Sequence, residues 1–286
     1  MSLTGKAKLA GIIGWPVAHS LSPVLHGHWL AEYQIDGAVV PLPARAEDFT
    51  AIVQGIRRAG FTGVNVTVPH KESAFAIAHS LDAAAKAAGA VNLLVFTDGK
   101  MEGRNTDALG LAESLREEIG ALNGKSVVLL GAGGAARGAI LALDMLGAGS
   151  IHLLNRDSKK AASLASALTP QVKAKIKAGA LADWSKAAGD AALVVNSTSA
   201  GMTGNPPLEI DLDALPNSAA VCDIVYNPLE TQLLKDAAGR GHKIIDGLGM
   251  FLHQAVPSFE AFFGVKPKVT PALREALVKV LRERQK

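Results

Sequence analysis

A glycine-rich turn between an apolar run and a helix-like segment is the first feature of this sequence that points to chemistry. Gly131, Gly133 and Ala136 form a G-x-G-x-x-A pattern directly after the apolar run at 127–130. In such a turn the first glycine permits a sharp bend, the second lets backbone N–H groups approach a pyrophosphate, and the small third residue allows close helix packing. Similar turns occur where nothing binds, but the strand before and the helix after this one favour a dinucleotide site. The cofactor residues predicted in the turn are Gly131, Ala132, Gly133, Gly134 and Ala135.

The residues after the next predicted strand indicate which dinucleotide binds. An NAD enzyme usually places Asp or Glu there to hold the ribose 2′-hydroxyl, but this chain has Asn155 and Arg156. A guanidinium suits a dianionic 2′-phosphate and offers nothing comparable to a neutral hydroxyl, so Arg156 favours NADP over NAD. Lys159 or Lys160 would add a second cation. Asp157 opposes this prediction, because a carboxylate turned inward repels the phosphate. The alternative to a cofactor-binding role is that Arg156 is only a solvated loop residue.

Polar side chains also gather at the ends of predicted strands, where open α/β sheets bind their ligands. The clusters are His19-Ser20-Leu21-Ser22, Asn65-Val66-Thr67 with Lys71, Asn92, and Asn105-Thr106-Asp107. Each has an ordinary structural explanation. Ser22 and Asp107 are suitable helix caps, and Lys71 is by default an exposed lysine. Asn65 and Asn92 lie in apolar surroundings, where a structural hydrogen bond is the usual reason for an amide.

Two series of short apolar runs are the elements that must position these residues. The first series comprises 9–13, 39–42, 64–68 and 91–96, and an Asp-Gly pair at 98–99 predicts a tight turn after it. The second comprises 127–130, 151–154, 193–196, 221–225 and 243–245. Segments with helical spacing separate the runs, which indicates an α/β fold. The continuous apolar runs of the second series suit parallel strands that are covered on both faces.

Four helical segments can be bounded from the sequence. Ser22 and Pro23 look like an N-cap and a first helical residue, opening a helix toward Glu32. The segment 107–120 has helical spacing and could bridge the two series, and 250–263 and 271–284 follow the second series.

Length and composition set the broad class of protein. A chain of 286 residues with 49% hydrophobic and 19% charged residues is globular and long enough for two domains. The net charge of +3 arises without a basic block, so neither a nucleic acid nor a membrane surface is an expected partner. Cys222 is the only cysteine, which excludes an internal disulfide and zinc-finger spacing. We expect no metal site and, in the absence of signal-peptide features, a cytoplasmic protein.

Taken together, the polar clusters and the glycine turn resemble the shikimate dehydrogenase family. The matching stretches are GWPVAHSLSP (14–23), GVNVTVPHK (63–71), GAVN (89–92), GRNTDALG (103–110), GAGGAARG (131–138), NR (155–156), NSTSAGM (196–202), DIVYNPLET (223–231) and DGLGMFLHQA (246–255). They follow the family's order and span nearly the whole chain. The resemblance implies an enzyme that uses NADPH to reduce 3-dehydroshikimate reversibly to shikimate. We expect a small-molecule substrate as its partner and leave open whether the protein is a monomer or a homodimer.

The resemblance also implies a role for each matching residue. Ser20 and Ser22 match the serines that bind the substrate carboxylate, and Lys71 with Asp107 matches the catalytic pair. The substrate-binding residues that it implies are Ser20, Ser22, Asn65, Thr67, Lys71, Asn92, Asp107, Tyr226 and Gln254. Beyond the glycine turn, the cofactor residues that it implies are Asn155, Arg156, Lys159, Thr198, Ile224 and Gly247. Asp157 departs from the small hydroxyl residue common in the family at that position.

The family's topology implies a two-domain α/β fold. Residues 1–107 would form an α/β substrate domain, and residues 108–247 a Rossmann-like domain with a doubly wound parallel sheet that binds NADP. Residues 248–286 would form C-terminal helices that return to the first domain. Such a return would explain a polar Gln254 on an otherwise apolar helix.

Three other functions compete with this prediction. Asp157 gives some support to an NAD-dependent quinate/shikimate dehydrogenase, but Arg156 and the Ser20-x-Ser22 pair oppose it. A ligand-binding regulator without turnover should have lost Lys71 or Asp107, and both are present. A methylene-tetrahydrofolate dehydrogenase of similar two-domain plan would not require the paired serines.

Overall fold

The computed structural model describes residues 3–284, and the chain divides into two compact units. Unit 1 comprises residues 3–106 and 254–280, and unit 2 comprises residues 107–253 and 281–284. The division between the units falls inside helix α10, Gly247–Phe263, after His253. The domain bounds predicted from the sequence stay a prediction. Within residues 3–284, no helix has the length and apolar character needed to cross a bilayer.

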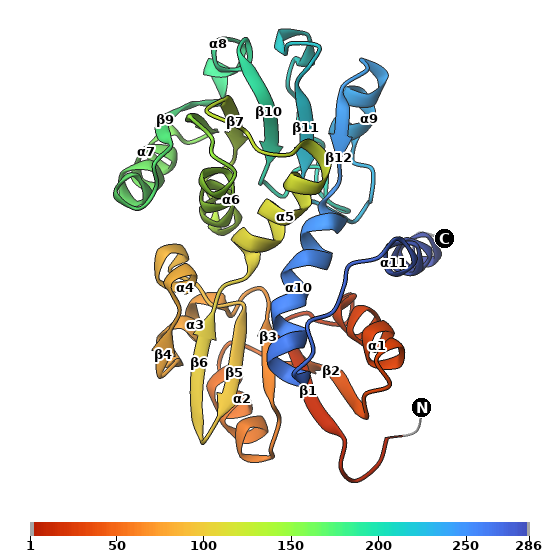
Figure 1. Cartoon of the computed structure of the whole chain (residues 1–286). Helices are drawn as coiled ribbons and strands as arrows, with labels where there is room; N and C mark the ends of the chain where they lie inside the picture. Colours follow the sequence, from red (N-terminus) through yellow and green to blue (C-terminus); the bar gives the residue numbers. More distant parts are fainter. Residues whose placement is uncertain (1–2, 285–286) are drawn as a thin grey trace. The chain divides into compact units, whose positions relative to one another are not determined.

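Unit 1 contains a six-stranded mixed sheet with the strand order β2-β1-β3-β5-β6-β4 (Figure 1). The strands are β1 Lys8–Gly14, β2 Gly37–Pro43, β3 Gly63–Val66, β4 Ser80–Leu81, β5 Leu93–Thr97 and β6 Lys100–Arg104. The helices are α1 Ser22–Glu32, α2 Phe49–Arg58, α3 Lys71–Ile77 and α4 Ala83–Ala88, with the later part of α10 and most of α11 Pro271–Arg284. Strands β2, β1 and β3 run parallel, whereas β5 runs antiparallel to both β3 and β6.

The alternation of side chains along β3 shows how this sheet is covered. Val64 and Val66 belong to the buried cluster to which α2, α3 and α4 contribute. The intervening residues face the opposite side, because a Cβ atom on Gly63 would lie 2.5 Å from the Phe262 ring of α10. Each face of the sheet is therefore packed against helices.

A two-residue turn joins β5 to β6. Asp98 and Gly99 both have positive φ angles, 49° and 73°. That combination is typical of the type I′ turn that matches the twist of an antiparallel pair. The tight turn predicted from the Asp-Gly pair is confirmed.

Unit 2 contains a six-stranded sheet in which all the paired strands run parallel, with the order β12-β11-β10-β7-β8-β9. The strands are β7 Ser126–Leu130, β8 Ser150–Asn155, β9 Lys175–Ala180, β10 Ala191–Asn196, β11 Ala220–Asp223 and β12 Lys243–Ile245. The helices are α5 Asp107–Ile119, α6 Gly134–Met145, α7 Ser158–Leu168, α8 Trp184–Ala188 and α9 Gln232–Gly239, with short 3-10 turns at Thr169–Gln171, Leu181–Asp183 and Leu212–Ala214. This is the strand order of a doubly wound dinucleotide-binding sheet, so the predicted fold class is confirmed.

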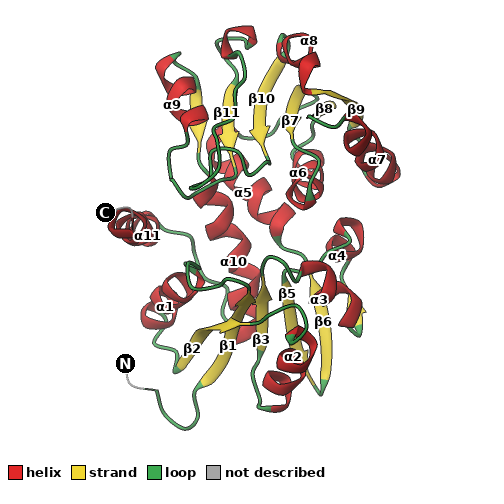
Figure 2. Ribbon diagram, turned by 180° about the vertical axis from the view of Figure 1, so that it is seen from behind, coloured by secondary structure: helices red, strands yellow, loops and turns green. Residues whose placement is uncertain are grey.

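Helices flank the sheet of unit 2 (Figure 2). Two buried clusters cover its two faces. Val127 and Leu129 of β7 pack with residues of α5, α6 and α7. Val128 and Leu130 of the same strand pack with residues of α8 and α9. Apolar side chains on both faces explain why these strands appear in the sequence as continuous apolar runs.

Candidate active site

The glycine turn follows β7, the strand at which the order of strands in unit 2 reverses. Strands β8 and β9 lie on one side of β7, and β10, β11 and β12 lie on the other. Gly131 has a φ of +102°, and a Cβ atom there would lie 2.8 Å from Cγ2 of Thr198. Both the backbone conformation and the lack of space therefore require glycine at this position. Gly133 is the N-cap of α6, and no atom lies within 4 Å of where a Cβ on Gly133 or Gly134 would be.

Open space beside an uncapped helix N-terminus fits the pyrophosphate of a dinucleotide. No side chain caps α6, so its first N–H groups are available to donate hydrogen bonds to an anion. The predicted residues Gly131, Ala132, Gly133, Gly134 and Ala135 form this turn and the start of α6. Their arrangement would let the backbone hold the diphosphate while α6 contributes its partial positive charge.

The loop from β8 to α7 carries the residues predicted to read the 2′-phosphate. Asn155 is the last residue of β8, and its Nδ2 donates to the backbone carbonyl of Asp157 at 3.0 Å. The Asp157 carboxylate caps α7 by accepting from the backbone N–H of Lys159 at 3.0 Å. Arg156 lies between them and is exposed. The carboxylate of Asp157 therefore acts locally at the helix start, which leaves the Arg156 guanidinium as the cation of this loop.

Strand directions explain why the polar clusters of unit 1 share one edge of its sheet. The carboxyl ends of β1 and β3 lie at that edge, followed by the loops that contain Ser20 and Thr67. Since β5 runs antiparallel to β3, the residue before β5, Asn92, lies at the same edge. Strand β6 reverses again, so Asn105, the residue after it, lies there too.

The β1 and β3 ends approach each other closely. A Cβ atom on Gly14 would overlap Cγ2 of Thr67, and the Trp15 N–H donates to the Val68 carbonyl at 3.1 Å. Glycine at the end of β1 is thus what allows Thr67 to sit beside the loop that leads to the paired serines.

The loop before α1 corrects the prediction that Ser22 caps the helix. Ser22 is the first residue of α1, with Leu21 at the N-cap, so Ser22 is not the cap that the sequence suggested. Its own N–H instead donates to Oγ of Ser20 at 3.2 Å. Ser20 therefore has a local structural role that the sequence did not reveal, while Ser22 is 8% exposed.

Asn92 fixes the loop after β6. Its Oδ1 accepts from the Thr106 N–H at 2.9 Å, and its Nδ2 donates to the Thr106 hydroxyl at 3.0 Å. Asn105 donates to the Ala90 carbonyl at 3.0 Å. These buried bonds hold the backbone of residues 105–106, and Asp107 follows directly as the first residue of α5.

Asn65 connects β3 to α10. Its Nδ2 donates to Oγ of Ser258 at 2.7 Å, and two residues earlier β3 meets Phe262. Two strand residues span about 6.6 Å and four helix residues about 6 Å, so strand and helix stay in step. If this spacing continues past the end of β3, we expect Gln254 to lie level with Thr67, at the sheet edge described above.

The remaining predicted residues lie at element ends. Lys71 is the half-buried first residue of α3, and its carbonyl accepts from the Val91 N–H at 2.9 Å. Tyr226 follows β11, and its ring centroid lies 5.1 Å from that of Phe251. Burial raises the pKa of the Tyr226 hydroxyl. Asp107 lies close to α6, since a Cβ atom on Gly138 of that helix would lie 3.3 Å from the Cβ of Asp107.

Three buried polar residues of unit 2 were not predicted from the sequence. Asn196 and Asp223 end β10 and β11, and Thr231 begins α9 as its N-cap. They join by hydrogen bonds beneath the loops that contain Thr198 and Ile224. In the sequence they lie at the ends of the matched stretches 196–202 and 223–231, but the match alone assigns them no role.

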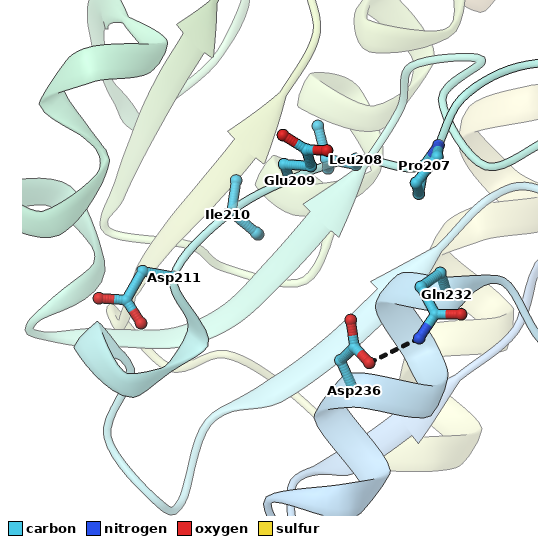
Figure 3. A pocket seen from close by; sticks show the side chains of 7 residues that line it. All are labelled: Pro207, Leu208, Glu209, Ile210, Asp211, Gln232 and Asp236. Atoms are coloured by element: carbon cyan, nitrogen blue, oxygen red, sulfur yellow. Dashed lines mark hydrogen bonds between the residues drawn. The ribbon is translucent and has the colours of Figure 1, made fainter.

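A pocket in unit 2 lies apart from every predicted site residue (Figure 3). Its lining includes Glu209, Asp211 and Asp236, and Gln232 donates to Asp236 at 2.7 Å. A rim of carboxylates disfavours an anionic ligand, whether a carboxylate substrate or a phosphorylated cofactor. This pocket therefore does not compete with the glycine turn as a cofactor site.

Three family profiles match the chain. The family described as shikimate dehydrogenase substrate binding domain matches residues 12–94, and shikimate / quinate 5-dehydrogenase matches residues 112–203. The shikimate 5′-dehydrogenase C-terminal domain matches residues 247–277. A relative from Rhodospirillum rubrum, named shikimate dehydrogenase (NADP(+)), is 50% identical over 283 residues, which are 96% of this chain and 99% of the relative.

Solved structures agree with these matches. A shikimate dehydrogenase in complex with NADP+ superimposes with a TM-score of 0.88 at 32% identity, over 99% of this chain and 97% of that one. A quinate dehydrogenase from Corynebacterium glutamicum in complex with NAD also gives a TM-score of 0.88, at 29% identity over 96% and 99% of the two chains. The fold alone therefore does not choose between the two substrates. From its sequence identity to relatives that it matches almost end to end, this chain belongs to the shikimate dehydrogenase family.

Proposed function

We propose that this chain catalyses the NADP-dependent, reversible reduction of 3-dehydroshikimate to shikimate. The observation that carries the proposal is the set of groups at one edge of the unit 1 sheet. Ser20, Thr67 and Asn92 lie in the loops at that edge, and Ser22 begins α1. Neutral hydrogen-bonding groups and a helix N-terminus suit a small ring that carries hydroxyls and one carboxylate.

The cofactor half of the proposal rests on unit 2. Open backbone at Gly133 and Gly134 would hold the diphosphate, and Arg156 would bind the 2′-phosphate through charge-assisted hydrogen bonds. Asp157 caps α7 through Oδ1, which directs this carboxylate to the start of the helix and supports Arg156 as the group that reads the cofactor. The bound cofactor supplies the hydride.

The chain must then supply one proton to the oxygen of the ketone. When the ketone is reduced, charge develops on its oxygen, and we assign Lys71 as the donor that neutralises it. Asp107, which matches the other member of the family's catalytic pair, would orient the Lys71 ammonium. In the oxidative direction Lys71 accepts the hydroxyl proton instead. Asn92 supports this pair by fixing Thr106, the residue before Asp107.

One assay separates this function from its rivals. Purified protein is given shikimate or quinate, each with NADP or NAD, and formation of reduced cofactor is followed by absorbance. We expect shikimate with NADP to have the highest kcat/KM of the four combinations. Faster oxidation of quinate with NAD would identify a quinate dehydrogenase, and no reduction in any combination would identify a binding protein without turnover.

Two further predictions concern the protein's surroundings. The cytoplasmic location and the monomeric or homodimeric state both stay predictions. Subcellular fractionation and sedimentation equilibrium would test them.

A further inference from the structure

Asp223 is a fully buried carboxylate that the proposed mechanism does not use. It ends β11, directly in register with Asn196 at the end of β10, and both are 0% exposed. Its Oδ1 accepts from Asn196 Nδ2 at 3.0 Å and from the Val225 N–H at 3.1 Å. Its Oδ2 accepts from the Thr231 hydroxyl at 2.7 Å. Burial raises the pKa of Asp223, while these three donors act in the opposite sense.

Asn196 extends the bonded group into the loop after β10. Its Oδ1 accepts from both the N–H and the hydroxyl of Thr198, at 3.0 and 2.7 Å. Thr198 in turn is the residue whose methyl group limits the space at Gly131. The side chain of Asp223 is therefore two hydrogen bonds away from the wall of the glycine turn.

Thr231 extends the group in the other direction. As the N-cap of α9, its hydroxyl accepts from the Leu234 N–H at 3.4 Å. The loop that it closes begins at Ile224, whose N–H donates to the Asn196 carbonyl at 3.1 Å. The Ile224 carbonyl lies so close to Gly247 that only glycine fits there. Both loops at the ends of β10 and β11 thus depend on one carboxylate.

The topology says which part of the cofactor these loops face. A doubly wound sheet has two mononucleotide-binding halves. Strands β7, β8 and β9 form the half with Arg156, which by the proposed function binds the adenosine 2′-phosphate. Strands β10, β11 and β12 form the other half, which is left for the nicotinamide mononucleotide.

We propose that Asp223 is a positioning residue for the nicotinamide half of the cofactor, because it holds the loops 197–203 and 224–231 through Asn196 and Thr231. The proposal rests on the proposed function as far as cofactor binding is concerned. It adds that NADPH affinity depends on a carboxylate that does not touch the cofactor.

The test compares a whole cofactor with its adenosine half. Kd values for NADPH and for adenosine 2′,5′-bisphosphate are measured with wild type and Asp223→Ala. We expect the NADPH Kd to rise about ten-fold, since the buried donors around Asp223 lose their acceptor. The Kd of adenosine 2′,5′-bisphosphate should stay at the wild-type value, because its site is on the other half of the sheet.

Asp144→Ala is the matched control. Asp144 Oδ1 also accepts two hydrogen bonds, from the N–H groups of Lys173 and Ala174 at 2.7 and 2.8 Å, but these precede β9 at the opposite edge of the sheet. This variant should lower the thermal unfolding midpoint and leave both Kd values unchanged. An unchanged NADPH Kd in Asp223→Ala, or an equal loss for both ligands, would overturn the proposal.

A second pair of variants decides the question if Asp223→Ala does not fold. Thr231→Val removes the hydroxyl at nearly constant volume, whereas Thr231→Ser keeps the hydroxyl and removes only the methyl group. We expect the valine variant to raise the NADPH Kd and the serine variant to recover the wild-type value; equal Kd values in the two would overturn the proposal. Failure of the wild type itself to bind NADPH would instead refute the proposed function.

Discussion

His26 offers a quantitative test of how unit 1 is packed. It lies on α1 with 1% of its surface exposed, and its ring stacks on that of Phe259, with 5.9 Å between centroids and 15° between planes. The Trp29 ring meets it edge-on at 5.9 Å. Burial lowers the pKa of His26 to about 3, and the neighbouring Asn65 side chain acts more weakly in the opposite direction.

The effect of this shift on stability follows from proton linkage. In the unfolded chain His26 titrates near its ordinary pKa of 6.5, so the unfolded state binds more protons than the folded state between pH 6.5 and pH 3. The stability due to neutral His26 is therefore complete above pH 6.5 and is lost as the pH falls. Between pH 7 and pH 5 the loss is about 2 kcal/mol, because one proton contributes about 1.4 kcal/mol per pH unit. That figure hardly depends on the folded-state pKa as long as it lies well below 5.

The assay is urea denaturation of wild type and His26→Phe at both pH values. Phenylalanine keeps an aromatic ring beside Phe259 and removes the titrating group. We expect the free energy of unfolding to fall between pH 7 and pH 5 by about 2 kcal/mol more in the wild type than in the variant. Trp29→Phe changes the same aromatic cluster without altering titration, so it should follow the wild-type pH dependence.

An equal loss in wild type and His26→Phe would refute the reasoning. It would mean that His26 is protonated in the folded protein at pH 5, and thus that α1 and α10 leave it accessible to water. A shift in the same direction for Trp29→Phe and His26→Phe would also contradict it, since only one of the two removes a proton-binding group.

Three further changes test the proposed site. Arg156→Ala should raise the KM for NADP far more than that for NAD, because only NADP has the 2′-phosphate, and equal changes would show that Arg156 does not read it. Ser20→Ala should weaken shikimate binding by roughly 1 to 3 kcal/mol. Thermal melting is measured alongside, because Ser20 also accepts a hydrogen bond from Ser22. An unchanged KM for shikimate would show that Ser20 does not bind the substrate carboxylate. In Lys71→Ala combined with Asp107→Ala, kcat should fall much less than the product of the single losses, and multiplicative losses would show that the two act independently.

The parallel sheet of unit 2 was largely predictable because its central strands are apolar on both faces. The strand of this sheet that the apolar pattern does not predict is β9, Lys175–Ala180, which lies at the sheet edge. Lys175 and Lys177 are characteristic of edge strands, where charged side chains prevent pairing with other chains. The same lysines interrupt the apolar run that identified the other strands.

The roles of candidate site residues were predictable only where a motif specifies them. Asn196, Asp223 and Thr231 lie within the matched stretches 196–202 and 223–231, but the match gives them no role, and only the register of β10 with β11 brings the first two together. Ser22 illustrates the opposite error. A serine before proline is a reasonable cap, but the helix begins one residue earlier and its N-cap is Leu21.

The central claim is that this chain reduces a ketone with NADPH, using Lys71 as the proton donor. The most direct measurement follows NADPH consumption and shikimate formation together, with 3-dehydroshikimate as substrate, in wild type and Lys71→Ala. We predict equal consumption and formation in the wild type, and in the variant a kcat lower by on the order of 10²- to 10⁴-fold with little change in NADPH affinity. NADPH consumption without shikimate, or a Lys71→Ala variant with wild-type kcat and a raised KM, would contradict the account.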